Sequence, residues 1–503
     1  MPSRPGWFFY LAPLLAGAMY PLAFAPFAIR PVALVALALF WFCLRGSSCK
    51  LAARQGWLFG VGMFGVGVNW IYHSLHLFGQ AVAPLAFVGA AFFVAVVALY
   101  PALFAWVQAR FFAKTQGVSR EFFVLPILWF SLEWFREWFL VGFPWLQIGY
   151  TGLDTPLQSL ASWGGVLMLS LAISLMAGAF AAALVHRRLS VLLSSVVVFV
   201  LLLMMGQLSG VQQWGSDVGA PLRVRMVQGN IEQGIKFEPR HLLPSLQKYV
   251  DLSLEGDADY DLLIWPETAV PVYFEQAEVF LQPFKDELLA REAHWLMGGF
   301  SWRDLTEETF NTVRVATLDE HVDYQKRHLV PFGEYMPFRW VLDFLRRWVA
   351  IPMSDISAGE GEPEPLPVGK TLAAISICYD DAFGLEVIRQ LPAAHYLVNV
   401  SNDAWFGDSW APVQHQEIAR LRALETDRHL LRSTNTGVTS SIDRLGVVQA
   451  SAAQFEATVL DVEIQPRQGE TFFVRFGNAP MFVFLLLCWA YLLFQARRDA
   501  RSY

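Results

Sequence analysis

The chain has 503 residues, of which 55% are hydrophobic and 16% are charged, and its mean hydropathy is +0.39. This composition is too apolar for a soluble protein, and the chain is too long for one simple domain. The formal net charge is −7 and no basic tract stands out, so nucleic acid is a poor candidate partner.

Eight apolar segments are expected to cross a membrane, seven of them before a long polar segment and one after it. Each has a suitable length for crossing a bilayer core except the second, which is short. The expected spans are residues 7–27, 32–44, 57–75, 82–109, 122–141, 160–185, 189–208 and 479–496.

The charges between these spans predict the orientation, because loops rich in Lys and Arg stay in the cytoplasm. Alternate loops lie on the same side of the membrane. On one side, the short loops contain only two basic residues, Arg30 and Arg136. The other side collects Arg4, Arg45, Lys50, Arg54, Arg110, Lys114, Arg120, Arg187, Arg188, Arg497, Arg498 and Arg501. Both termini are therefore expected to be cytoplasmic and the polar segment to lie outside. The expected domains are 1–209, with seven spans, 210–478, exported, and 479–503, with the last span and a tail.

The exported segment alternates between runs typical of strands and runs typical of helices, which predicts a layered α/β domain. Loops are expected at 302–308 and 357–370. Helices are predicted at 242–255, 275–293, 383–391 and 414–433. Strands are predicted at 222–227, 261–265, 295–299, 312–318, 322–326, 372–377, 396–400, 437–442 and 458–462.

One aromatic, amphipathic segment stands apart within this domain. Residues 338–351 include Trp340 and Trp348, with two arginines beside the second tryptophan. Tryptophan beside arginine suits the membrane interface, where the segment could contact lipid substrate. An ordinary core helix of the soluble domain fits the same pattern equally well.

Cys378 is the lone cysteine of the exported segment. Cysteines that build disulfides in an oxidising compartment come in pairs, so this thiol is either a small buried hydrophobe or a reactive group. It ends a β-branched apolar run, as an active-site nucleophile at a strand end would. The motifs upstream of it favour the reactive group.

Two upstream residues could serve a cysteine nucleophile. Glu267, in Trp-Pro-Glu, could accept the thiol proton. Lys326 could stabilise the oxyanion formed by attack on a carbonyl, together with the backbone N–H of Tyr379. The product would be a thioester on Cys378. Glu334, eight residues after the lysine, could orient that lysine or assist the second proton transfer. Each of these charges taken alone would more often be a surface residue.

These residues resemble the Glu-Lys-Cys triad of the nitrilase superfamily. With the membrane spans, nearly the whole chain is similar to the apolipoprotein N-acyltransferase family, a membrane-bound branch of that superfamily. The most specific run is Ser401-Asn-Asp-Ala-Trp-Phe-Gly407, and further motifs are Leu22–Phe27, Asn69–His76, Glu133–Arg136, Gly142–Trp145, Val227–Ile231, Gln414-His415, Ala419-Arg420, Arg422-Ala423, Glu425, Arg432 and Thr434–Gly437.

The resemblance implies a nitrilase-like αββα sandwich, with Glu267 as general base, Lys326 as transition-state stabiliser and Cys378 as acyl carrier. Glu334 becomes an essential supporting carboxylate. The implied reaction is ping-pong: the thiol takes an acyl chain from a phospholipid and passes it to the α-amino group of a diacylglyceryl-cysteine apolipoprotein. The implied location is the bacterial inner membrane, with the catalytic domain in the periplasm. No cofactor or metal is expected, and the protein is expected to act as a monomer.

The sequence departs from the family pattern at two positions. Asp380 stands where the family usually has glutamate, and Phe237 where it often has tryptophan. Asp380 is expected to be a supporting residue, and Phe237 an aromatic substrate contact. Trp405 and Phe406 could line the acyl pocket or belong to the core.

Three other functions compete with acyl transfer. A membrane-anchored nitrilase-type amidase or esterase shares the triad and differs only in the acceptor. A non-catalytic scaffold is disfavoured because all three triad residues are present. A transporter is disfavoured because the spans carry few charges and show no evident inverted repeat.

Overall fold

The computed structural model describes residues 6 and 8–501, except 80, 116–117, 141, 257–258, 318–321 and 337–354. Two compact units make up the chain. The helical unit comprises Met1–Tyr72, Ala83–Gln212 and Phe476–Tyr503, and the second unit comprises His73–Val82 and Gln213–Arg475. The predicted segment 338–351, with Trp340 and Trp348, lies wholly outside the described residues.

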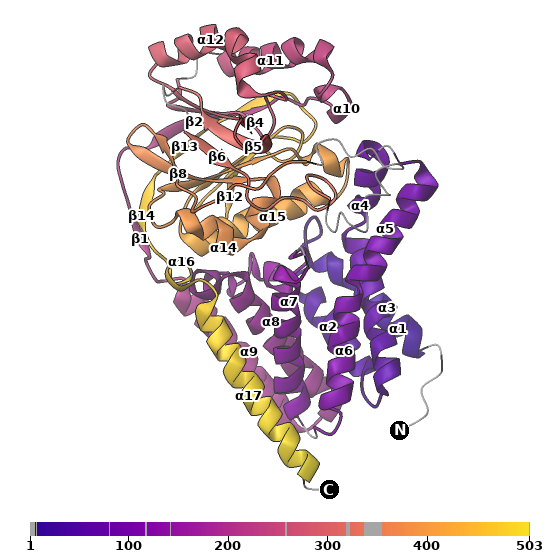
Figure 1. Ribbon diagram of the computed structural model, residues 1–503. Coiled ribbons are helices and arrows are strands. Elements are labelled where there is room, and N and C mark those ends of the chain that lie inside the picture. The colour runs from indigo at the N-terminus through magenta and orange to yellow at the C-terminus, as the bar shows by residue number, and fades with distance from the viewer. Residues whose placement is uncertain are drawn as a thin grey trace. The chain divides into compact units, whose positions relative to one another are not determined.

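The helical unit is built from apolar helices (Figure 1). Ser48 is the N-cap of the helix that starts at Cys49, because its side chain accepts a hydrogen bond from the Leu51 N–H. The elements are α1 (Phe8–Met19), η1 (Tyr20–Ala23), α2 (Pro31–Cys43), α3 (Cys49–Gly67), α4 (Trp70–His73), α5 (Ala83–Val97), α6 (Leu99–Phe111), η3 (Arg120–Val124), α7 (Leu125–Trp138), η4 (Ile148–Gly152), η5 (Gln158–Leu160), α8 (Ala161–His186), α9 (Leu189–Ser209) and α17 (Ala479–Arg501).

Among the described residues, three helical stretches are long and apolar enough to cross a membrane, namely Ala83–Phe111, Gln158–His186 and Leu189–Ser209. Shorter apolar helices cover Phe9–Ala23, Pro31–Cys43 and Ala479–Gln495. Together they coincide with six of the eight expected spans, and the count of eight stays a prediction. The expected span 57–75 does not form one helix, because α3 ends at Gly67 and α4 begins only at Trp70.

Within its described residues, the second unit holds a two-stranded sheet, β1-β14, and two six-stranded sheets. The orders of the six-stranded sheets are β12-β11-β10-β9-β8-β7 and β13-β2-β3-β4-β5-β6. The strands are β1 (Gly215–Asp217), β2 (Leu222–Gln228), β3 (Leu262–Ile264), β4 (His294–Arg303), β5 (Glu308–Val315), β6 (Asp323–Gln325), β7 (Leu366–Val368), β8 (Thr371–Ile377), β9 (Tyr396–Ser401), β10 (Leu430–Thr434), β11 (Ser440–Ile442), β12 (Val448–Ser451), β13 (Thr458–Ile464) and β14 (Arg467–Gly469).

Helices cover the outer faces of both sheets. In Figure 1, α11 and α12 lie beyond one sheet, and α14 and α15 beyond the other. The helical elements of this unit are η2 (Ser74–Phe78), α10 (Gln233–Lys236), α11 (Pro239–Leu254), α12 (Phe274–Ala290), η7 (Cys378–Ala382), α14 (Gly384–Val387), η8 (Ile388–Gln390), η9 (Asp403–Phe406), α15 (Ala411–Thr426) and α16 (Phe472–Phe476), the last ending at the boundary between the units.

Side-chain alternation along the strands builds the layers. On β3, Leu262 and Ile264 join the core between the sheets, whereas Leu263 joins the core under α11 and α12. On β8, Ile375 faces the central core and Ala374 the core that includes residues of α15. The predicted layered α/β domain is therefore confirmed as an αββα sandwich.

The predicted helix 414–433 is wrong in its last part. Helix α15 ends at Thr426, Asp427 takes a left-handed conformation with φ of 54°, and β10 follows. Strand β10 lies between β9 and β11 in its sheet, where Leu430 and Leu431 are buried in the cores on opposite faces. This burial outweighs the helical spacing of the leucines.

Two predicted loops are shorter than expected. The segment 302–308 belongs largely to the β4–β5 hairpin, which leaves only 304–307 as its turn. The segment 357–370 contains β7, which pairs antiparallel with β8. Proline and glycine in that segment obscured a three-residue edge strand.

Candidate active site

Glu267 follows β3 at the carboxyl end of a parallel strand, and its side chain is 5% exposed. Both of its oxygens are bound. Asn311 Nδ2 donates to Oε1 at 2.8 Å, and the backbone N–H of Asn402 donates to Oε2 at 2.7 Å. The neighbouring strand must carry a glycine here, because a Cβ at Gly298 would lie 2.8 Å from the Glu267 Cα. The carboxylate is therefore held in one orientation.

Lys326 follows β6 and binds two carboxylates. Its Nζ lies 2.8 Å from Glu334 Oε1 and 3.4 Å from Glu267 Oε1, and the lysine is 1% exposed. Burial favours the neutral amine, but the charges of Glu334 and Glu267 raise the pKa of Lys326 well above its usual value. Lys326 is therefore a fixed cation at neutral pH.

Glu334 is held by its own turn. Its Oε2 accepts the N–H of Val330 at 2.8 Å, and its backbone N–H donates to the Val330 carbonyl. Asn311 Nδ2 also reaches Glu334 Oε1, at 3.1 Å. The structure thus brings together three of the predicted residues and adds Asn311.

Cys378 stands at a sharp turn where β8 passes into η7. Its φ of 49° is left-handed, which is uncommon for a residue with a Cβ. Burial raises the pKa of the Cys378 thiol well above its usual value; the charge of Glu267 raises it further and that of Lys326 lowers it. The thiol is therefore neutral at rest and needs a base at the moment of attack.

Asp380 lies two residues after the cysteine, and its buried carboxylate accepts three hydrogen bonds. Its carboxylate accepts the N–H groups of His328 at 2.8 Å and Ile377 at 3.1 Å, and the Tyr324 hydroxyl at 3.1 Å. Burial raises the pKa of Asp380 to about 7, although Lys326 acts to lower it. Asp380 therefore fastens the turn after the nucleophile to the strand that leads to Lys326.

Sequence reasoning missed two residues that touch Glu267. Asn311 is fully buried inside β5, a strand that mixes polar and apolar residues, so its amide gives no distinctive signal in the sequence. Lys236 is 2% exposed, and its Nζ donates to the Glu267 carbonyl oxygen at 3.3 Å. In the sequence, Lys236 precedes the aromatic Phe237 and carries no motif that marks it as a contact of Glu267.

The buried amine of Lys236 should destabilise the folded protein at neutral pH. Burial lowers the pKa of Lys236 from 10.5 to about 7, so its contribution to stability is full above pH 10.5 and is lost as pH falls toward 7. One pKa unit corresponds to about 1.4 kcal/mol. We expect Lys236→Met to raise the free energy of unfolding by at least about 1 kcal/mol at pH 7, net of the lost bond to Glu267.

Thermal unfolding of the purified protein in detergent at pH 7 and pH 10 measures this effect. The difference in Tm between variant and wild type should shrink at the higher pH. A variant that unfolds at a lower temperature than wild type at pH 7 would show that the bond to Glu267 outweighs the burial of the charge.

Two family models match this chain. The model for the apolipoprotein N-acyltransferase N-terminal domain matches residues 16–179, and the model for carbon-nitrogen hydrolase matches residues 223–471. The apolipoprotein N-acyltransferase of Azotobacter vinelandii is 39% identical, over 99% of this chain and 98% of its own length. That of Methylococcus capsulatus is 40% identical, over 93% of each chain. The chain belongs to the apolipoprotein N-acyltransferase family.

This membership confirms the resemblance drawn from the Glu-Lys-Cys motifs and the most specific run, 401–407. The structure assigns that run to the end of β9 and to η9. Its Asn402 holds Glu267, and its Asp403 accepts the Ser401 hydroxyl at 2.7 Å. In this member of the apolipoprotein N-acyltransferase family, the run therefore touches the candidate base directly.

The aromatic candidates of this family member are partly exposed. Trp405 and Phe406 lie on η9; the Trp405 carbonyl accepts the Ser74 hydroxyl at 2.8 Å, and the Phe406 ring lies 6.2 Å from that of His415. Phe237 ends α10 with 36% of its surface exposed. Their contact with substrate stays a prediction.

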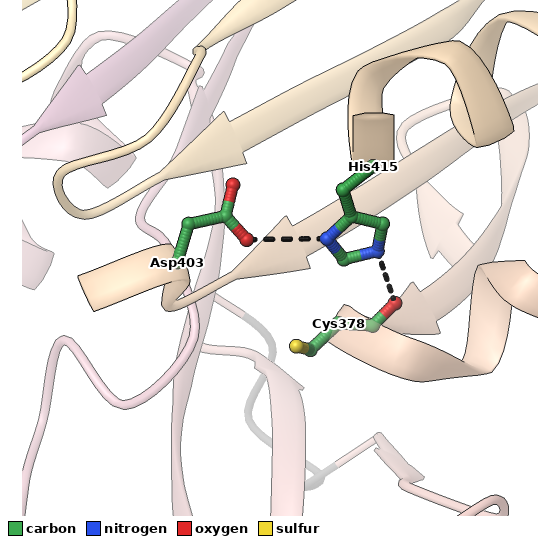
Figure 2. A group of neighbouring side chains, drawn as sticks. All are labelled: Cys378, Asp403 and His415. Atoms are coloured by element: carbon green, nitrogen blue, oxygen red, sulfur yellow. Dashed lines mark hydrogen bonds and ion pairs between the residues drawn. The ribbon is translucent and has the colours of Figure 1, made fainter. Parts of the chain in front are cut away.

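One group of side chains has the spacing of a metal site, although no metal was expected from the sequence. Ligand atoms of Cys378, Asp403 and His415 lie within 4.8 Å of one another. Figure 2 shows that the contact between Cys378 and His415 is made by the Cys378 carbonyl oxygen and not by its sulfur. The guanidinium of Arg432 already binds both oxygens of Asp403, at 2.9 and 3.2 Å, and lies 2.9 Å from His415 Nδ1. That cation neutralises the group in the way a metal ion would.

Arg432 was expected on the same helix as Arg420, Arg422 and Glu425. The expectation of one charged helix is wrong, since α15 carries the latter three and β10 carries Arg432. Arg422 Nη2 binds Glu425 Oε1 at 2.9 Å, with both side chains buried. This pair therefore belongs to the buried interior of the domain.

Proposed function

We propose that the protein transfers an acyl chain from a phospholipid, through a thioester on Cys378, to the α-amino group of an apolipoprotein's N-terminal diacylglyceryl-cysteine. The observation that supports this most is the buried arrangement of Glu267, Lys326 and Glu334, whose first two charges act on the thiol of Cys378. Family membership supports the choice of acceptor, because the relatives are named apolipoprotein N-acyltransferases.

In the first half-reaction, Cys378 Sγ attacks the ester carbonyl carbon while its proton passes to Glu267. The oxyanion forms beside the cation of Lys326 and the backbone N–H of Tyr379. Collapse breaks the ester C–O bond, and Glu267 returns the proton to the leaving oxygen of the lysophospholipid. A thioester on Cys378 remains.

In the second half-reaction, the α-amino nitrogen attacks the thioester carbon. Glu267 accepts a proton from the nitrogen, the C–S bond breaks, and the sulfur regains a proton. The product is an amide and the free enzyme. Glu334 and Asn311 keep Lys326 and Glu267 in place through both steps, and Asp380 supports the turn that carries the nucleophile.

The proposed setting follows the expected topology. Eight spans, within 1–209 and 479–503, hold the catalytic segment 210–478 on the periplasmic face of the bacterial inner membrane, with both termini in the cytoplasm. The protein acts there as a monomer. Both substrates are anchored in lipid, so a site at the membrane face needs no extraction of either one. Substrate contacts are assigned to Phe237, Trp340, Trp348, Trp405 and Phe406.

Intact mass of the purified protein tests this proposal. The protein is incubated with a synthetic dipalmitoyl phospholipid and then with a diacylated Cys-Ser lipopeptide, beside the variant Cys378→Ala. We expect a palmitoyl adduct only where Cys378 is present, and its discharge as an N-acylated lipopeptide. Discharge as free fatty acid would favour the alternative, a nitrilase-type hydrolase, and a folded protein that forms no adduct would contradict both.

A further inference from the structure

A buried charged network lies behind the nucleophile and takes no part in the two half-reactions described above. Asp381, Asp403, His415 and Arg432 are each at most 1% exposed. They come from η7, η9, α15 and β10 respectively. Four ionisable groups in a dry interior are costly unless fully paired. Such a network needs a structural or functional reason.

The four groups are joined to one another by ion pairs and hydrogen bonds. His415 Nε2 lies 2.8 Å from Asp381 Oδ1, and His415 Nδ1 lies 3.2 Å from Asp403 Oδ1. Arg432 binds Asp403 and Asp381 and also donates to Asn399 Oδ1. The backbone leaves no room beside Asp403, because a Cβ at Gly437 would lie 2.2 Å from Asp403 Oδ2. The imidazole and the Asn399 amide are therefore fixed in orientation.

Both fixed groups converge on one backbone atom, the carbonyl oxygen of Cys378. His415 Nε2 lies 3.3 Å from it, and Asn399 Nδ2 lies 3.4 Å from it and also donates to Ser376 Oγ at 3.0 Å. Figure 2 shows this oxygen turned toward His415 and the sulfur on the opposite side of the Cys378 residue. The network thus holds the peptide unit between Cys378 and Tyr379 in one orientation. Cys378 is also the residue with the left-handed φ.

The carbonyl of Cys378 and the N–H of Tyr379 belong to the same planar peptide unit. In a trans peptide these two groups point in opposite directions. Holding the carbonyl toward His415 therefore directs the Tyr379 N–H away from His415, to the side on which the sulfur lies. An acyl oxyanion formed on that sulfur needs a donor on that side.

We propose that His415 and Asn399 are positioning residues that aim the Tyr379 N–H at the oxyanion by holding the Cys378 carbonyl. Arg432, Asp381 and Asp403 hold these two in turn. The inference rests on the proposed thioester chemistry but not on the identity of the acyl donor or acceptor.

A matched pair of variants separates this role from general support of the fold. In His415→Gln the side-chain amide nitrogen reaches the place of Nε2, next to the Cys378 carbonyl. In His415→Asn it reaches only the place of Nδ1, next to Asp403. Both variants are neutral and polar, so they share the loss of the imidazole and differ in the contact to the carbonyl.

The rates of two reactions of the Cys378 thiol are measured on the full-length protein in detergent. Acylation by 4-nitrophenyl butyrate builds an oxyanion, whereas alkylation by iodoacetamide displaces iodide and builds none. We expect His415→Asn to slow acylation at least about 10-fold, since one oxyanion donor contributes about 100-fold or more. The rate of alkylation of His415→Asn should stay within about threefold of the wild-type rate. The rates of both reactions of His415→Gln should also stay within about threefold of wild type.

Equal loss of acylation and alkylation in His415→Asn would overturn the inference, and so would identical behaviour of the two variants. If neither variant folds, Asn399→Ser decides, because it removes the second contact to the same carbonyl. It should again slow acylation more than alkylation, and equal slowing would contradict the proposal. A protein that is acylated by the ester but not by phospholipid would instead contradict the proposed donor and leave this result standing.

Discussion

Replacing Lys326 by methionine is expected to reduce acyl transfer by about 1000-fold or more, because an oxyanion donor alone contributes about 100- to 1000-fold. The fold should suffer as well. Lys326 is the cation between Glu267 and Glu334, and all three side chains are buried. Removing one partner from such a cluster costs about 3–5 kcal/mol. Release of lysophospholipid and thermal unfolding measure the two effects.

A double variant separates the lost chemistry from the lost stability. In Lys326→Met/Glu334→Gln the second carboxylate is also neutralised, while the glutamine oxygen can still accept the Val330 N–H. Glu267 then keeps its bonds from Asn311 and Asn402. We expect most of the stability to return and the activity to stay lost.

The same substitution at an exposed lysine serves as a control. Lys370 lies in the turn between β7 and β8, so Lys370→Met should leave both Tm and acyl transfer unchanged. Recovery of acyl transfer in the double variant would contradict a direct role of Lys326 at the oxyanion. It would mean that the lysine only holds the two carboxylates apart.

The sequence predicted the layers of the second unit because its strands carry strong local signals. Predicted strands such as 222–227 and 372–377 coincide closely with β2 and β8, since β-branched runs with turn residues at both ends are typical of buried strands. The strand β10 could not be found in the same way. Its leucines continue the spacing of α15, and only pairing with β9 and β11 reveals the strand.

The candidate site was predictable where residues stand at strand ends beside distinctive neighbours, as Glu267 and Cys378 do. The groups that hold these residues were not. Asn311, Lys236 and His415 reach the site from a strand, a short helix and a long helix, and their contacts are tertiary. A single sequence does not give distances between such elements. The motif 401–407 indicated importance without indicating that Asn402 binds the base.

Glu267→Gln is expected to slow acylation of Cys378 by about 100- to 10,000-fold, the usual contribution of a positioned base. Glutamine has nearly the same shape, and its oxygen can still accept the N–H of Asn402. Its amide nitrogen, however, then faces the donors of Asn311 and Lys326, so the free energy of unfolding should fall by about 1–3 kcal/mol. The exposed Glu463→Gln on β13 is the control and should behave as wild type.

The thiol itself should respond in the opposite direction. Burial and the charge of Glu267 both raise the pKa of Cys378, so removing that charge lowers the pKa and populates more thiolate at a given pH. The pH midpoint of alkylation by iodoacetamide should therefore move to lower pH in Glu267→Gln, while acylation by phospholipid slows. A base that only supported the fold would lower both rates together. Opposite changes in the two reactions require that Glu267 carries the proton that acyl transfer must move.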